Sequence, residues 1–102
     1  MKACTCFCYP ASFAPGAAQH YDVTFPDFPG CVSQGDDLED AIRMAQQALT
    51  MHLSGMLEDG EELPTPSSLD GARTKEEAFA MSDGYVLPEG ILYRFVTVDI
   101  SR

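Results

Sequence analysis

Four cysteines are the residues of this sequence whose type and spacing first raise the possibility of metal or thiol chemistry. Cys4, Cys6 and Cys8 alternate with other residues, so all three would lie on one face of a β-strand. Cys4 and Cys8 would then be roughly 13 Å apart, too far for one zinc ion with Zn–S bonds of about 2.3 Å. Neighbours on one strand face are also poorly placed for a disulfide. We therefore interpret these cysteines as small apolar residues of a buried or interface strand.

The fourth cysteine and the two histidines also lack a catalytic context. Cys31 has no general base beside it in the sequence, so we interpret it as a packed small residue rather than a nucleophile. His52 lies among apolar residues at helical spacing, which favours a hydrogen-bonded core or interface histidine. Neither His20 nor His52 has metal-ligand spacing to the cysteines, and the sequence has no C-x-x-C pair. It also has no G-x-S-x-G, H-E-x-x-H or phosphate-binding motif, so we expect neither a catalytic residue nor a metal or other cofactor.

Carboxylates are the remaining candidates for chemistry. Asp22 and Asp99 fall on two predicted strands, and this pair alone could meet a divalent metal across a sheet. The alternation of a strand could equally place both side chains in solvent. The other acidic residues lie where helix caps and solvated faces are expected, so they explain a fold better than a reaction.

The charge of the chain indicates what kind of partner it prefers. Sixteen acidic residues oppose six basic ones, for a net charge of −10. Such a chain repels a phosphate backbone, so we expect no direct nucleic-acid binding, and it attracts a basic protein. The alternative is that the charge only provides solubility. The sequence shows no signal peptide and no apolar run near the ~20 residues of a membrane span, so we expect a cytoplasmic protein with no membrane contact.

The length of 102 residues predicts one domain spanning residues 1–102. A hairpin is predicted from two β-rich runs joined by a turn that contains Gly16. Pro26 should end the second strand, and Pro29-Gly30 should form a fixed corner into a third. The predicted strands cover residues 2–13, 20–25, 31–34, 85–87 and 91–100.

Two helices are predicted between the third strand and the closing ones. Apolar residues at helical spacing predict a long helix over Leu38–Glu58, with Gly60 as its left-handed cap. Thr74 and Glu77 have the spacing of a capping box, which predicts a short second helix from that point. The element order is β-β-β-α-(short α)-β. We expect an α+β fold with two layers, in which a three-stranded antiparallel sheet and a further C-terminal strand pack on one long helix.

The most specific segments of this sequence are "FPDFPGC" (residues 25–31), "SQGDDLEDA" (33–41), "ALTMHL" (48–53) and "EDGEELPTPS" (58–67), followed by the closing strand "VTVDIS". Together they closely resemble the HicB family of bacterial antitoxins. The pieces occur in the family's order and cover most of the chain. The resemblance implies a HicB-like domain with a partial RNase H-like fold. Many relatives continue into a DNA-binding segment, which is not evident after Ser101-Arg102, so the sequence is similar to a short form.

The resemblance also implies a function, which is to bind and neutralise a small basic HicA-type toxin that cleaves mRNA. HicB-type proteins are not enzymes, and they form dimers or higher assemblies, so we expect a homo-oligomer. The residues that we predict to touch the toxin are four acids at the start of the long helix: Asp36, Asp37, Glu39 and Asp40. The alternative role of these acids is to cap the helix.

Two other hypotheses remain open. The first is an orphan HicB-like module for protein binding or oligomerisation that has no toxin partner. The second is an enzyme of RNase H-like descent that holds a metal between Asp22 and Asp99. The first strand carries Cys, Thr and Phe in place of the metal-binding carboxylate that RNase H requires, which argues against the enzyme.

Overall fold

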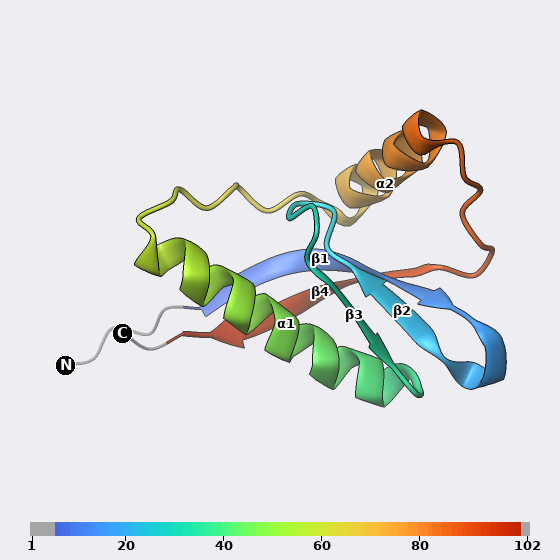
Figure 1. Cartoon of the computed structure of the whole chain (residues 1–102), viewed down its shortest axis with the longest axis horizontal. Helices are drawn as coiled ribbons and strands as arrows, with labels where there is room; N and C mark the ends of the chain where they lie inside the picture. Colours follow the sequence, from blue (N-terminus) through green and yellow to red (C-terminus); the bar gives the residue numbers. More distant parts are fainter. Residues whose placement is uncertain (1–5, 101–102) are drawn as a thin grey trace.

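The strand β1 (Cys6–Pro15) organises the sheet in the computed structural model, which describes residues 6–100. It pairs on one side with β2 (Tyr21–Thr24) and on the other with β4 (Leu92–Asp99), while β3 (Val32–Gly35) pairs with β2. All pairings are antiparallel, and the strand order β3-β2-β1-β4 leaves β3 and β4 at the edges (Figure 1). The predicted hairpin, third strand and closing strand are confirmed, and so is the α+β class.

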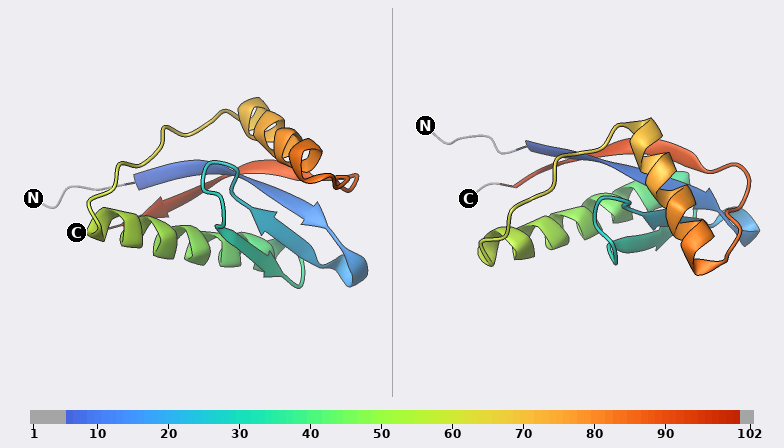
Figure 2. Two further views of the ribbon diagram at one scale, coloured as in Figure 1. Left: turned by 45° about the horizontal axis from the view of Figure 1, so that its top comes forward. Right: turned by 90° about the horizontal axis from the view of Figure 1, so that it is seen from above.

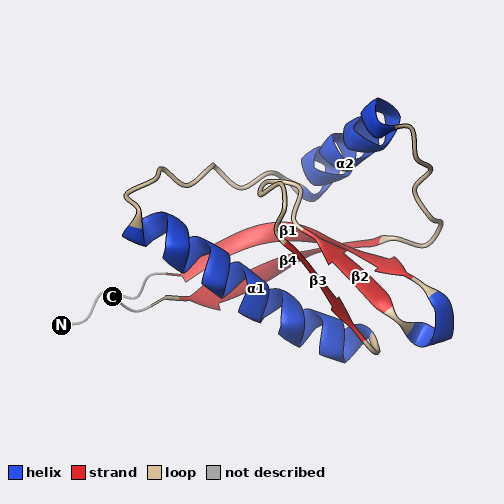
Figure 3. Ribbon diagram, in the orientation of Figure 1, coloured by secondary structure: helices blue, strands red, loops and turns tan. Residues whose placement is uncertain are grey.

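The two helices lie on opposite faces of this sheet, as Figure 2 shows. The long helix α1 (Leu38–Glu58) has the predicted bounds and packs beneath all four strands. The shorter helix α2 (Leu69–Asp83) crosses the other face, where it contacts β1 and β4. A long loop joins the helices and a second one joins α2 to β4, as the colouring by secondary structure makes plain in Figure 3. None of the helices in residues 6–100 is long and apolar enough to cross a membrane.

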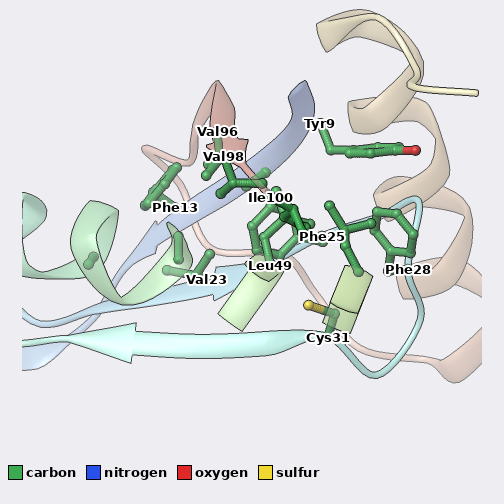
Figure 4. Packing of buried hydrophobic residues seen from close by; sticks show 14 residues of the cluster. Tyr9, Phe13, Val23, Phe25, Phe28, Cys31, Leu49, Val96, Val98 and Ile100 are labelled. Atoms are coloured by element: carbon green, nitrogen blue, oxygen red, sulfur yellow. The ribbon is translucent and has the colours of Figure 1, made fainter. Parts of the chain in front are cut away.

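The core lies between the sheet and α1, and its residues recur at the spacing expected of a strand and of a helix. Alternate residues of β1 face α1, and register brings Tyr9 opposite Val96 and Phe13 opposite Val23. Burial of each large apolar side chain contributes about 1.5–3 kcal/mol. Figure 4 labels these side chains with others of the same buried cluster, among them Leu49 of α1. The buried positions of α1 are spaced by four residues: Ala41, Ala45, Leu49 and Leu53.

The segment between β2 and β3 folds as two successive reverse turns, which we call the corner (residues 25–31). The amide of Phe28 donates to the carbonyl of Phe25 at 2.9 Å, and the amide of Cys31 donates to that of Phe28 at 2.9 Å. A proline follows the first residue of each turn, where its fixed φ is favourable. Gly30 has φ +91°, which a glycine adopts without strain. The predicted fixed corner is confirmed, and Cys31 is buried as expected.

The region around α2 departs from prediction. The helix begins at Leu69, because Ser68 caps it by accepting a hydrogen bond from the amide of Gly71 at 3.0 Å. Thr74 lies inside the helix and donates to the carbonyl of Asp70, so the predicted start there is wrong. The predicted strand over residues 85–87 is also wrong, because this segment is a loop that pairs with no described strand.

The cysteine-rich strand differs from prediction in burial. Cys6 and Cys8 are exposed on the sheet face opposite α1, whereas Cys4 lies outside the described residues. These two positions are therefore not core positions, and a role in an interface remains a prediction. His52 is half-buried and packs its ring against Phe28, with centroids 5.1 Å apart, and among residues 6–100 it has no hydrogen-bond partner of the kind expected.

Candidate partner-binding surface

The four predicted contact acids gather at the first turn of α1, and two of them cap it. Asp37 accepts a hydrogen bond from the amide of Asp40 at 2.8 Å, and Asp40 accepts one from the amide of Asp36 at 3.0 Å. The Arg43 guanidinium also pairs with Asp40. The hydrogen bond from the Asp36 amide, followed by that from Arg43, lowers the pKa of Asp40 below its ordinary value. Asp37 and Asp40 therefore stabilise the start of α1 through these hydrogen bonds.

The other two acids of this group are differently placed. Asp36 and Glu39 are exposed, and their carboxylates have no partner among residues 6–100. Nothing in the fold requires their charge beyond the general preference for acids at a helix N-terminus, worth about 0.3–1 kcal/mol. Asp36 and Glu39 are therefore the two predicted contact acids that could pair with a partner protein at little cost in folding stability.

The proposed metal pair is separated by the length of the sheet. Asp22 lies opposite Ala14 and Asp99 lies opposite Cys6, which are near the two ends of β1. At about 3.3 Å per residue these positions are roughly 26 Å apart, so the two carboxylates cannot share one ion. Asp22 instead lies 3.0 Å from Nε2 of His20. In the described part of the chain, no three Cys, His, Asp or Glu side chains gather as metal ligands.

A buried carboxylate in the corner was not predicted as important. The side chain of Asp27 is fully buried and accepts three hydrogen bonds, from the amide and hydroxyl of Ser67 and from Nζ of Lys75, at 2.6–2.8 Å. It therefore ties the corner to the loop after α1 and to α2. Burial alone would raise the pKa of Asp27, but these hydrogen bonds lower it below its ordinary value. The sequence feature that could have marked Asp27 is its position between two Phe-Pro pairs.

A second buried carboxylate lies between α2 and the sheet. Glu76 accepts from the hydroxyl of Ser12 at 2.6 Å and from that of Tyr93 at 2.5 Å. Burial, followed by the hydrogen bond and charge of Glu76, raises the pKa of Tyr93 well above its ordinary value. Tyr93 therefore stays protonated and acts as a donor. No local pattern marks Glu76, because its donors come from strands 64 and 17 residues away.

The face of α2 that packs on the sheet carries mostly small side chains, and the large apolar side chains of this helix are exposed to solvent. Ala72, Glu76 and Ala80 face the sheet, whereas Phe79 is 44% exposed and Met81 is 84% exposed. A groove of about 310 Å³, which we call the α2 groove, runs between this helix and the corner. Its lining residues are Thr24, Phe25, Pro26, Pro29, Gly30, Glu76, Phe79, Asp83 and Tyr85.

The fold, the corner and the capped helix match one protein family along nearly the whole chain. The family model of the HicB-like antitoxin of bacterial toxin-antitoxin systems matches residues 9–101. The chain belongs to this family. The expectation drawn from the resemblance of its segments is thus confirmed at the level of the family.

Curated relatives of the HicB-like chain match part of its length. A 14.9 kDa protein from the rep-hol intergenic region of Haemophilus phage HP1 is 48% identical over 50 residues, which cover 49% of this chain and 38% of that protein. Antitoxin HicB 1 of Photorhabdus laumondii is 40% identical over 58 residues, covering 57% and 37%. The matched segment thus spans less than two-fifths of these relatives.

Two solved structures share the fold. A chain of a toxin-antitoxin complex from Streptococcus pneumoniae aligns with a TM-score of 0.79 and 25% identity, covering 93% of this chain and 70% of that one. The N-terminal domain of Burkholderia pseudomallei antitoxin HicB aligns with a TM-score of 0.62 and 28% identity, covering 92% of this chain and all of that domain (100%). The fold of this chain is therefore shared, over more than nine-tenths of its length, with solved chains at 25–28% identity.

Proposed function

We propose that this protein is the antitoxin of a toxin-antitoxin pair and that it neutralises a small basic HicA-type toxin that cleaves mRNA. The observation that carries the proposal is the family match over residues 9–101. The solved relative that aligns best by TM-score among those described above is itself part of a toxin-antitoxin complex. Its presence in that complex supports, by similarity, a protein partner for this chain.

The charge of the chain fits such a partner. A net charge of −10 favours a basic protein and speeds its diffusional capture. Both helices also end without a basic residue in their last turn, although a cation there would be favourable by about 0.3–1 kcal/mol. No basic residue therefore offsets the partial negative charge at these two helix ends, which leaves that charge open to a cationic partner.

We further propose that the chain acts by binding and not by catalysis, in the cytoplasm and without a cofactor. The only carboxylate pair that the sequence offered for a metal, Asp22 and Asp99, is too widely separated to serve. The two buried carboxylates, Asp27 and Glu76, are already satisfied by hydrogen bonds within the fold. Both therefore have structural roles that leave them poorly suited to proton transfer.

Co-expression with the small reading frame beside its gene tests this proposal. A tag on the neighbour alone should retain this protein through a wash at moderate salt, and the pair should restore growth that the neighbour alone prevents. A neighbour that purifies by itself contradicts the antitoxin function. The protein would then be an orphan HicB-like binding or oligomerisation module.

A further inference from the structure

We propose that the α2 groove binds an arginine side chain of the basic partner. The inference deepens the proposed function, on which it rests for the nature of the partner. No described cation lines this groove, whereas two carboxylates do, Glu76 at its buried side and Asp83 at the end of α2. The occupant that fits this charge is a cation.

The placement of Asp83 adds to the negative potential. It is the last residue of α2, where the helix dipole already presents partial negative charge. The C-terminal carbonyls and the Asp83 carboxylate thus act together on whatever enters the groove. Asp83 is exposed and its carboxylate has no partner among the described residues, so its charge is available to a ligand.

The apolar walls favour arginine over lysine. Phe79 and Tyr85 are 44% and 49% exposed, and they line the groove together with the prolines of the corner. A guanidinium is planar and weakly hydrated, so it stacks on aromatic rings while it pairs with a carboxylate. A volume of about 310 Å³ accommodates one such side chain but is at the low end for a drug-sized ligand.

Lys75, which lines an adjoining hollow, does not compete for the groove. That hollow shares Phe79 with the α2 groove and is also lined by Asp27 and Ser82. The Lys75 ammonium is 2.6 Å from the buried Asp27 carboxylate, which holds it toward the corner. The groove therefore keeps its negative charge, and the rigid corner presents one wall in a fixed position.

Titration of the full chain by ¹H–¹⁵N NMR tests the inference with defined probes, the peptides acetyl-Gly-Arg-Gly-amide and acetyl-Gly-Lys-Gly-amide. The arginine peptide should shift the amides of Gly30, Phe79 and Tyr85 in a saturable way. We expect it to bind about threefold more tightly than the lysine peptide, because the aromatic walls reward the guanidinium. Shifts of equal size at the acidic first turn of α1 would overturn the proposal, as would equal affinities for the two peptides.

Matched variants on α2 sharpen the test. Asp83→Asn and Phe79→Ala should each weaken the arginine peptide about fivefold, a loss typical of one ion pair or one stacking contact. Glu77→Gln and Met81→Ala make comparable changes outside the groove and should leave the affinity unchanged. Equal losses in all four variants contradict a groove-specific site. If the peptide binds as expected but the tagged neighbour does not co-purify, the groove stands and the antitoxin function fails.

Discussion

Asp27 and Lys75 form an ion pair of 2.6 Å in which the carboxylate is fully buried and the lysine is half exposed. The pair joins the corner to α2, and within the described residues no other side-chain hydrogen bond does so. Since Ser67 donates twice to the same carboxylate, three separate segments depend on one acidic side chain. This ion pair thus helps to position α2 beside the corner, together with the hydrogen bonds of Glu76 to the sheet.

Replacement of Asp27 by Asn should therefore destabilise the fold. The amide can accept fewer of the three hydrogen bonds, and unmet buried donors cost about 1–3 kcal/mol. Asp70→Asn is the matched control, because Asp70 pairs with Arg73 at the surface, where the pair is worth under about 1 kcal/mol. Urea unfolding followed by circular dichroism measures both variants. Equal losses would mean that Asp27 contributes no more than a surface ion pair.

The same carboxylate predicts a dependence of stability on pH. Its pKa in the folded protein is lowered below the ordinary value of 3.8, so its contribution is fully present above that pH. The contribution is lost as the pH falls through the lower, folded pKa. The difference in unfolding free energy between the wild type and Asp27→Asn should thus be constant from pH 5 to 7 and shrink below pH 3.8. A difference that grew on acidification would contradict the assignment.

Gly35 predicts a second stability effect, at the junction of β3 and α1. A Cβ built there would lie 2.3 Å from the amide nitrogen of Ala41 and 2.8 Å from the carbonyl carbon of Asp40. Backbone atoms cannot move aside as a flexible side chain can, so Gly35→Ala should cost about 1–3 kcal/mol. Gly55 lies inside α1 with open space around it, and Gly55→Ala should instead stabilise by about 0.5–1 kcal/mol. Thermal unfolding of both variants should show shifts of opposite sign.

Local chemistry made much of this fold predictable. Apolar residues at helical spacing from Leu38 to Glu58 form one continuous face that a sheet can cover. This spacing was enough to predict the bounds of α1. The prolines of the corner act through their own φ angles, so their turns needed no tertiary information. Asp37 could be placed as a cap because its partner is only three residues away.

Apart from the start of α2, which local residues set, the rest depended on contacts between distant segments. Thr74 and Glu77 had the spacing of a capping box, but Ser68 lies after two prolines that already exclude helix, so the helix begins there. Glu76 looked like a surface acid until Ser12 and Tyr93 were brought beside it by the sheet. The α2 groove could not be anticipated at all, because its walls come from the corner and from a helix about 50 residues later.

Self-association remains a prediction, and the sheet edges are where we expect it. β4 is an edge strand with Phe95 49% exposed, and such an edge invites pairing with a second copy. Light scattering after gel filtration should give a dimer or larger species, and Phe95→Lys should shift it toward monomer. Val86→Lys adds the same charge to a residue that is 92% exposed in the preceding loop and should have no effect. A monomeric wild type would exclude this expectation.

The acidic turn of α1 gives a final prediction, because the structure separates charge from capping there. Asp36→Asn with Glu39→Gln removes two charges but leaves the caps Asp37 and Asp40 in place. The helix content should not change, while association with the basic partner should slow severalfold at low salt and less near 0.15 M, where the Debye length is about 8 Å. Stopped-flow association rates measured across ionic strength give the comparison.

The matched control for that pair is Glu61→Gln with Glu62→Gln, which removes the same charge from the exposed loop after α1. If capture depends only on the net charge of −10, both double variants slow association equally. If the turn of α1 faces the incoming partner, its variant is the slower one and its rate has the weaker salt dependence.

Asp37→Ala, in contrast, should lower stability by about 0.5–2 kcal/mol through loss of the cap. If Asp37→Ala weakens binding only in proportion to its loss of helix content, Asp37 has a structural role. Asp36 and Glu39 would then remain as the acids that contact the partner.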